Sequence, residues 1–472
     1  MTASLHHESI VELSDKITTG EITSRQLVQV CLDRIEKFDA RVNGFVSVLG
    51  DLALEQANRS DRRRAAGRPA GPLDGIPIGV KDSIPTAGIR TTSNSRVLEN
   101  WIPRCDAEAI GRLRDAGAIV LGKTNLNEFG WSLPANTDLT PKALNPWNTT
   151  YAAIGSSSGS AVSVAAGFVA AAVGTDGGGS VRLPAGQHNL IGIKASHGTV
   201  SRRGMGESWV SEIAPMTRTV ADAALMLSVM ASGPRGSSPD LIARLDANIS
   251  GWTLGVPRHL IDASGLEDEV SDAFEGSLDR LRSLGVNLVE VEPPGLAEAR
   301  MANFVMLNGL AHAAHAVSLR TQREKYGQSA RVYHWTGAFL SATDLLNARA
   351  VANRVRDLLQ QAFGSVRALV MPTSPVVTAE AARNPDTHRK GANAVFTSPF
   401  NATGHPAISV PSGFSPTTGL PIGLQLVGPL GGERTLLQIA YALERLSDWQ
   451  SVRADLARPD VASTSDPFAR PD

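Results

Sequence analysis

The chain has 472 residues and a formal net charge of −1, because 45 Lys and Arg side chains nearly balance 46 Asp and Glu side chains. This balance excludes the uniformly basic surface that is typical of proteins that bind nucleic acid directly. With 42% hydrophobic residues and two cysteines, Cys31 and Cys105, the composition indicates an ordinary globular protein and excludes a disulfide scaffold or a cysteine-rich zinc site.

Neither the N-terminus nor the apolar runs indicate a membrane or secretory segment. Residues 1–21 carry polar side chains every few positions and have no apolar stretch of the kind found in secretory signals. The longest apolar run, Ala161–Gly174, is too short to cross a bilayer. The sequence therefore predicts a cytoplasmic protein without a membrane partner.

Helices and short apolar strands alternate along the chain. The helices predicted from apolar periodicity are Thr23–Val48 (with Ser24 as N-cap), Asp106–Ala118, Val220–Met230, Glu267–Leu284, Met301–Arg320 and Leu345–Phe363. The strands predicted from short apolar runs are Ala118–Leu121, Thr253–Val256, Val286–Val291, Ala368–Met371, Ala407–Val410 and Gly423–Leu426. This alternation predicts an α/β layer fold. No linker divides the chain, so we expect one domain over residues 1–472, with residues 458–472 as a polar, poorly ordered tail.

Two Ser- and Gly-rich loops, Gly155–Ser160 and Gly174–Ser180, flank a run of small apolar residues that we expect to form a closely packed helix. In the second loop, three glycines precede Ser180. Glycines allow the backbone to turn several N–H groups toward one point, which is what an oxyanion hole requires. Ser180 at the end of that loop is then a candidate nucleophile.

A serine nucleophile needs a base, and the residues alone leave its identity open. None of the ten histidines has a convincing carboxylate partner nearby in the sequence. Lysines are the other option, since burial lowers the pKa of an amine and allows its neutral form to accept a proton. Lys81 directly follows the apolar run Ile76–Val80, and Lys123 and Lys194 also have apolar neighbours. Spacing alone makes Lys81 one candidate among several.

Taken together, Lys81 and segments Gly155–Ser160 and Gly174–Pro184 resemble the amidase signature family of serine hydrolases. Ser156 precedes Ser180 by 24 residues, which is the family's spacing. Further segments that resemble the family are Gly122–Phe129, Asn145–Asn148, Pro215–Val220, Met371–Pro375, Phe400–Pro406 and Gly419–Gly428. Several motifs in the right order are far more specific than any one of them.

The resemblance implies an α/β domain with a central mixed β-sheet flanked by helices on both faces. It also implies a Ser–cisSer–Lys triad, in which Ser180 attacks the acyl carbon and Ser156, at a cis peptide, passes its proton to Lys81. The implied oxyanion donors are the N–H groups of Gly177, Gly178, Gly179 and Ser180. Asp176, Arg182 and Ser157 are implied to hold the two loops.

The implied reaction is amide cleavage through an acyl-enzyme, extending in some family members to carbamates, hydrazides or esters, without a metal or organic cofactor. The expected partner is a small-molecule amide, and a homodimer is one assembly that the resemblance allows. The chain departs from the family pattern at Ile154 and Ser158, where glycine is common. Neither change removes a triad residue, so the departures bear on pocket shape more than on chemistry.

Three alternatives remain. Gly155–Gly159 also matches the G-x-S-x-G elbow of α/β-hydrolases, which would make Ser157 the nucleophile and His405 the base, but no buried strand is predicted before it. His312 and His315 share one face of a predicted helix, yet two packed or exposed histidines are the better interpretation. The family also includes the glutamine-hydrolysing amidase subunit of a tRNA-dependent amidotransferase, whose triad would be identical.

The resemblance places substrate contacts after Gly122–Phe129 and in a variable helical region, here roughly 301–340. Large apolar side chains in these regions would suit an apolar or aromatic acyl group, although such residues are more often buried for packing. The candidate pocket residues are Phe129, Gly130, Trp131, Trp209, Met306, Trp335 and Phe339. The sequence does not identify which amide, carbamate or ester is the substrate.

Overall fold

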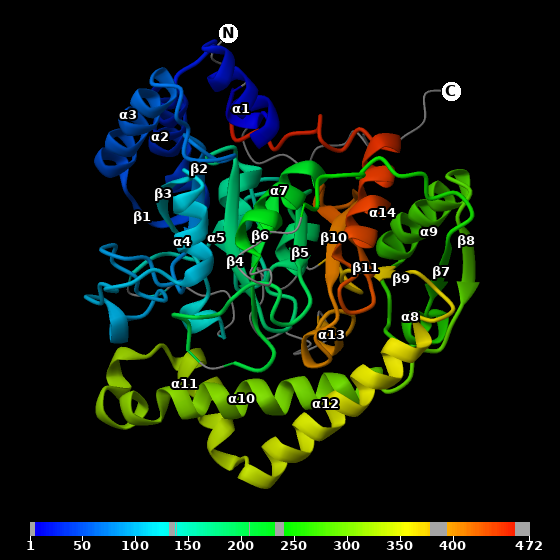
Figure 1. Cartoon of the computed structure of the whole chain (residues 1–472). Helices are drawn as coiled ribbons and strands as arrows, with labels where there is room; N and C mark the ends of the chain where they lie inside the picture. Colours follow the sequence, from blue (N-terminus) through cyan, green and yellow to red (C-terminus); the bar gives the residue numbers. More distant parts are fainter. Residues whose placement is uncertain are drawn as a thin grey trace.

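One mixed sheet of eleven strands runs through the part of the chain that the computed structural model describes, residues 5–131, 137, 139–206, 208–231, 240–377 and 394–457 (Figure 1). The strands are β1 Phe45–Val48, β2 Pro77–Lys81, β3 Ile119–Thr124, β4 Ala171–Asp176, β5 Ile191–Lys194, β6 Glu212–Thr217, β7 Thr253–Val256, β8 Asn287–Glu290, β9 Leu369–Pro372, β10 Ala407–Phe414 and β11 Pro421–Val427. Their order is β1-β3-β2-β4-β6-β5-β10-β11-β9-β7-β8. Strands β3, β2 and β4 run parallel, as do β9, β7 and β8, and the pairs between these two groups are antiparallel. The predicted α/β fold with a mixed central sheet is confirmed.

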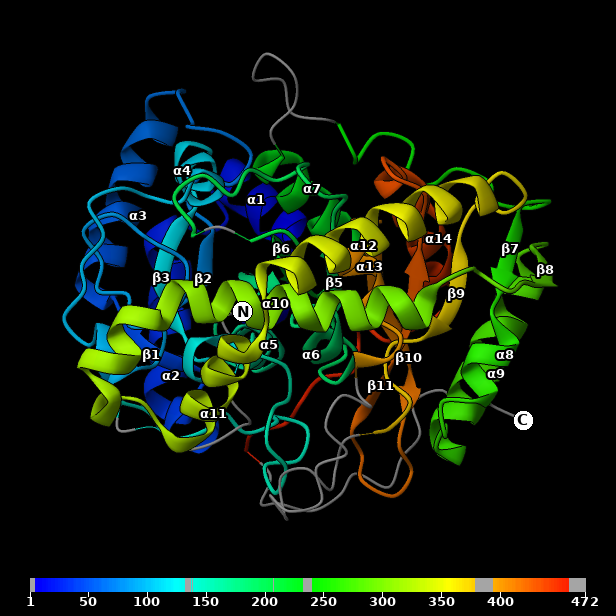
Figure 2. The same cartoon turned by 90° about the horizontal axis from the view of Figure 1, so that it is seen from below.

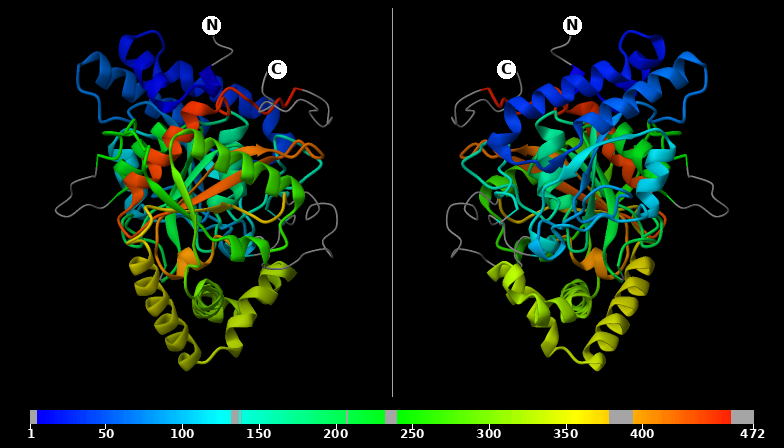
Figure 3. Two further views of the ribbon diagram at one scale, coloured as in Figure 1. Left: turned by 90° about the vertical axis from the view of Figure 1, so that its right-hand side faces the viewer. Right: turned by 90° about the vertical axis from the view of Figure 1, so that its left-hand side faces the viewer.

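Helices flank this sheet, and three of them form an outer layer below it in the view of Figure 1. The helices are α1 Ile10–Thr19, α2 Ser24–Val42, α3 Gly50–Ala65, α4 Glu108–Asp115, α5 Ser158–Ala165, α6 Arg182–Gly186, α7 Val220–Met230, α8 Arg258–Asp262, α9 Asp268–Ser283, α10 Leu296–Thr321, α11 Gln328–Thr336, α12 Ala342–Ala362, α13 Pro399–Ala402 and α14 Glu433–Leu446. Helices α5 and α6 contact each other, as do α7 and α14. Figure 3 shows α10, α11 and α12 packed together below the sheet, and Figure 2, seen from below, shows them in front of it. None of the described helices is long and apolar enough to cross a membrane.

The helix predicted over Thr23–Val48 is shorter than expected. It begins one residue later, because the side chain of Thr23, and not of Ser24, accepts the N–H of Gln26 and caps the helix. Asn43 ends the helix in the left-handed conformation with φ 53°. The residues after it form β1, which pairs with β3 at the edge of the sheet. Sheet pairing thus overrides the apolar periodicity that suggested a longer helix.

The small-residue run Ala161–Gly174 is also not one helix. Its first part belongs to α5, and its last part is in the strand β4. Between them, Gly167 adopts a φ of +70° and turns the chain at the end of the helix. The Ala- and Val-rich part then pairs with β2 and β6 in the middle of the sheet, where both faces are covered. A buried strand and a buried helix look alike in such a run.

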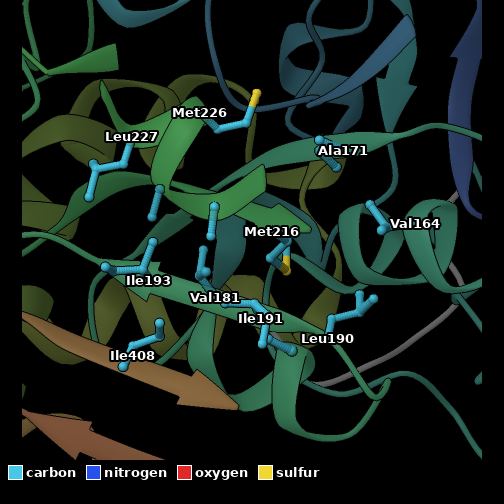
Figure 4. Packing of buried hydrophobic residues seen from close by; sticks show 14 of the residues in the cluster. Val164, Ala171, Val181, Leu190, Ile191, Ile193, Met216, Met226, Leu227 and Ile408 are labelled. Atoms are coloured by element: carbon cyan, nitrogen blue, oxygen red, sulfur yellow. The ribbon is translucent and has the colours of Figure 1, made fainter. Parts of the chain in front are cut away.

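The core beside β4 consists of tightly packed aliphatic and methionine side chains (Figure 4). Ala171 is fully buried on β4, and Met216 and Met226 are buried on β6 and α7. Dense packing of this kind fixes the strand positions, because deleting even one buried methylene is costly. The ends of β2 and β4 are therefore rigid places for functional side chains.

The predicted tail, residues 458–472, lies outside the described residues.

Candidate active site

The carboxyl ends of β2 and β4 bring the candidate base to the serine loops. The two strands are parallel, with Ile78 beside Ala171 and Val80 beside Val173. Lys81, the last residue of β2, therefore lies next to the end of β4, which is formed by Thr175 and Asp176. In α/β sheets, ligands bind outside the carboxyl ends of strands, which is where these side chains meet.

Lys81 is fully buried and is surrounded by hydroxyl groups. Its Nζ lies 2.8 Å from Ser156 Oγ, 3.0 Å from Ser157 Oγ and 2.9 Å from Thr175 Oγ1. Burial lowers the pKa of Lys81 from 10.5 to about 7, against the opposing charge of Asp176. A substantial share of neutral amine therefore exists at neutral pH, as a general base requires.

The loop before α5 presents Ser156 and Ser157 to Lys81. Gly174 allows this approach, because a Cβ at that position would lie 2.6 Å from Ser157 Oγ. The N–H of Ser157 donates to the carbonyl of Ser180 at 3.2 Å, so the two serine loops lie side by side. The structure differs from the expectation at Ser156, because all described peptide bonds are trans. The Lys81–Ser156 contact forms with the peptide bond at Ser156 in the trans state.

Hydrogen bonds to its carbonyl groups hold the glycine loop. Asn303 Nδ2 on α10 donates to the carbonyl of Gly177 at 3.1 Å, and Thr397 Oγ1 donates to the carbonyl of Gly178 at 2.7 Å. The N–H of Gly179 donates to Asp176 Oδ1 at 2.7 Å. Our expectation of four oxyanion donors is wrong for Gly179 in this conformation, because the buried carboxylate already uses that donor. Within the described residues, the N–H groups of Gly177, Gly178 and Ser180 have no such bond.

Asp176 and Arg182 form a fully buried ion pair beneath the loop. Arg182 Nη2 lies 2.9 Å from Asp176 Oδ1, and both side chains have no exposed surface. Arg182 also donates to Gln425 and Asn401, and the backbone N–H groups of Gly179 and Val181 donate to Asp176. Burial alone would raise the pKa of Asp176, but the charge and hydrogen bonds of Arg182 hold it well below its usual range. Both residues thus hold the loop, as the resemblance implies.

Ser180 is half-buried at the end of this loop. Its hydroxyl makes no hydrogen bond to any described residue, so Ser180 and Ser156 are not linked by a hydrogen bond in this structure. Catalytic hydrogen bonds are often long or absent until substrate binds. The link between Ser156 and Lys81 is already in place.

Gly130 also lies beside Ser156 and Lys81. A Cβ at Gly130 would lie 3.3 Å from Ser156 Oγ and 3.9 Å from Lys81 Nζ. The preceding residue, Phe129, has an unusual φ of 54° for a residue with a side chain. We infer that the turn at 129–130 keeps the space beside the two side chains open.

Gly130→Ala is expected to lower the rate of fluorophosphonate labelling and amide hydrolysis at least tenfold. The new methyl group would crowd Ser156, in addition to the strain of about 1–2 kcal/mol that a left-handed alanine carries. Gly20→Ala is the matched control, because Gly20 has a φ of +75° and nothing within 4 Å of its Cβ position. The labelling rate of both variants is measured by stopping the reaction after fixed times and recording the intact mass by mass spectrometry. Equal labelling rates for the two variants would contradict the inference that the position of Gly130 beside Ser156 matters.

Four of the seven predicted pocket residues lie in two apolar clusters. Phe129 packs on His315, with ring centroids 4.3 Å apart, and Trp335 joins the same cluster of α10 and α11. Met306 and Trp209 form a second cluster with Leu307, whose side chain abuts the glycine loop. Trp131 is half-exposed after the turn.

Phe339 is wrongly predicted as a pocket residue, because its side chain is 88% exposed. It lies in the short 3-10 connection Gly337–Phe339 between α11 and α12. Proximity in sequence to the variable helices suggested the pocket, whereas the turn points this residue outward.

The structure does not assemble the α/β-hydrolase alternative. No strand directly precedes Ser157, whose hydroxyl contacts Lys81 and the carbonyl of Thr175. His405 instead contacts Thr403 and the ring of Phe363. His312 and His315, the residues of the alternative metal site, have different partners. His315 contacts the hydroxyl of Tyr326, and His312 contacts the carbonyl of His334.

Sequence reasoning missed Thr175, Asn303 and Thr397 as parts of the site. Thr175 lies within the Gly174–Pro184 motif, and the pairing of β2 with β4 would have pointed to it. Asn303 and Thr397 come from segments 126 and 219 residues away from the carbonyls they hold. Their sequence surroundings carry no signal for such a contact.

The comparisons with known proteins agree with this geometry. A family model described as Amidase matches residues 26–437. The chain is 35% identical to a curated protein of Geobacter sp. (strain M21), a subunit of glutamyl-tRNA(Gln) amidotransferase, over 95% of this chain and 99% of that protein. A crystal structure of an amidase matches 93% of this chain and all of its own with a TM-score of 0.84 and 29% identity. Native peptide amidase from Stenotrophomonas maltophilia matches 97% of this chain and 99% of its own with a TM-score of 0.80 and 29% identity.

Proposed function

Because the chain belongs to the amidase family, we propose that it hydrolyses a carboxylic amide through a covalent acyl-enzyme on Ser180. The observation that carries this proposal is the contact between the buried amine of Lys81 and Ser156 Oγ at 2.8 Å, next to the loop that ends in Ser180. The buried amine contacts hydroxyl groups, and the nearby carboxylate of Asp176 is paired with Arg182 instead. Its neutral form can therefore act as a base and abstract a proton at neutral pH.

In the proposed reaction, Ser156 gives its proton to neutral Lys81 and takes the proton of Ser180. The Ser180 oxygen bonds to the acyl carbon, and the electron pair of the carbonyl moves to its oxygen. The N–H groups of Gly177, Gly178 and Ser180 would stabilise this oxyanion, and a single such donor is typically worth about 10²–10³ in rate. The proton then returns along the same side chains to the leaving nitrogen, and water hydrolyses the acyl-enzyme.

The curated relatives favour one source of the amide. The relative from Geobacter is named as part of an enzyme that transfers an amide, and the similarity extends over 95% of this chain. Under this interpretation, the amide is the side chain of glutamine, and the ammonia released passes to a partner protein. These relatives support an amidotransferase role more directly than they support a free-standing amidohydrolase.

A second candidate is the hydrolysis of a neutral amide by the chain alone. The side chains nearest to Gly177 and Gly178 are uncharged, namely Leu307, Ser211, Asn303 and Ser398. A free amino acid carries an ammonium and a carboxylate, and burying these without counter-charges is costly. The described lining of the loop therefore favours an amide without charged groups near the scissile bond. The likeness to amidase and peptide amidase structures points the same way.

One set of measurements separates the two candidates. Ammonia release is measured from glutamine, benzamide and N-acetylphenylalaninamide, with the chain alone and after co-expression with the remaining amidotransferase subunits. Glutamine hydrolysis that rises at least tenfold with those subunits, with the two neutral amides untouched, supports the first candidate. Neutral amide hydrolysis by the chain alone supports the second. If no amide is cleaved and a fluorophosphonate leaves no adduct on Ser180, the proposed chemistry is wrong for both.

A further inference from the structure

The three hydroxyl groups around Lys81 differ in what they can still donate. A protonated lysine has three N–H donors, whereas a neutral lysine has two donors and one lone pair. With three oxygen neighbours at 2.8–3.0 Å, the neutral amine can therefore donate to two of them and must accept from the third. Which hydroxyl donates decides where the base acts.

Ser157 is fixed as an acceptor. Its hydroxyl donates to the carbonyl of Thr175 at 3.2 Å, and the N–H of Thr175 donates to its oxygen at 3.2 Å. The single hydroxyl proton of Ser157 is thus already used, and its oxygen can only receive an N–H from Lys81. This leaves Ser156 and Thr175 as the two groups that can give a proton to the amine.

Thr175 and Ser156 differ in their surroundings. Thr175 is half-buried at the end of β4, so its own hydroxyl proton can point to solvent while its oxygen accepts from Lys81. Ser156 is buried in the loop that lies against Ser180. Asp176 is the charged group that acts on Lys81 within the described chain, and its carboxylate is held by Arg182 instead of contacting the amine.

We propose that Thr175, together with Ser157, is a positioning residue that holds the two N–H bonds of neutral Lys81 and thereby aims its lone pair at Ser156. This inference rests on the proposed function. When the proton of Ser156 moves to Lys81, the ammonium then has three acceptors, because the Ser156 oxygen, having taken the proton of Ser180, still offers a lone pair. No bond to Thr175 or Ser157 has to break during the transfer.

The test compares Thr175→Val, which removes the hydroxyl at nearly constant shape, with Thr175→Ser, which retains it. The rate of fluorophosphonate labelling of Ser180 and the kcat of amide hydrolysis are measured against pH. Thr217→Val is the matched control, since Thr217 lies at the other end of the same sheet region, opposite Ala171, and its hydroxyl contacts the carbonyl of Thr219.

We expect Thr175→Val to lower both rates about 10- to 100-fold with little change in KM, and to move the loss of activity on acidification to lower pH. The direction follows because the lost acceptor stabilised the ammonium more than the neutral amine, so that the pKa of Lys81 falls below about 7. Thr175→Ser and Thr217→Val should keep the wild-type profile. A Thr175→Val profile that falls in height without moving in pH, or that matches the wild type, overturns the inference. If wild-type Ser180 takes no label at all, the proposed function fails instead.

Discussion

Replacing Ser180 with alanine is expected to lower amide hydrolysis by about 10⁴-fold or more and to abolish covalent labelling by fluorophosphonates. The methyl group cannot attack the acyl carbon, so the acyl-enzyme route closes. The residual rate would come from binding and from the oxyanion donors alone. Intact-mass spectrometry and ammonia release, measured on the same preparation, give both quantities.

Ser163→Ala is the control for this prediction. Ser163 is a buried serine, and its hydroxyl donates to the carbonyl of Ser160 within α5, away from Lys81. Its loss is expected to cost about 1 kcal/mol of stability and to leave labelling unchanged. An adduct that persists in the Ser180→Ala variant and maps to Ser157 would contradict our assignment and restore the α/β-hydrolase interpretation.

Asp176→Asn is expected to lower the free energy of unfolding by about 3–5 kcal/mol. The substitution keeps the shape of the side chain but leaves the guanidinium of Arg182 buried without its counter-charge. It also weakens the acceptor for the N–H groups of Gly179 and Val181, so the glycine loop should loosen and activity should fall as well. Urea unfolding followed by far-UV circular dichroism measures the stability.

The sign of the pH dependence gives a second check. The pKa of Asp176 lies below its unfolded value, so the stability from this pair is present above the ordinary carboxyl pKa and declines as pH falls below it. Asp176→Asn should lose that part of the acid sensitivity. Asp279→Asn, in the exposed pair with Arg282, should change stability by less than about 0.5 kcal/mol. If Asp176→Asn unfolds as the wild type does, the buried pair is not what holds the loop.

Local patterns predicted much of the fold. The helix α7 and the strand β7 have the predicted bounds, because each is a short apolar segment between clear boundary residues. The error at Ala161–Gly174 has a physical cause: alanine and valine satisfy a buried strand and a buried helix equally well. Only the pairing of that segment between β2 and β6 decides, and pairing is a property of the assembled sheet.

The candidate site divides in the same way. The resemblance to the amidase signature family assigned Lys81, Ser156 and Ser180, whereas spacing alone left Lys81 one candidate base among several. Thr175 could not be assigned a role from spacing, since its contact with Lys81 depends on the register of two parallel strands. The use of the Gly179 N–H by Asp176 depends on a turn conformation that three successive glycines leave undetermined.

The bond from Asn303 to the carbonyl of Gly177 has a consequence for exchanging parts between relatives. Lys81, Ser156 and Thr175 all lie at the ends of sheet strands or in the adjoining loop, whereas the helices α10, α11 and α12 form a separate outer layer. Asn303 is a polar link from that layer to the glycine loop. A graft of residues 296–362 from another amidase could therefore transfer a new substrate preference onto this sheet, provided that the donor helix brings an amide side chain to position 303.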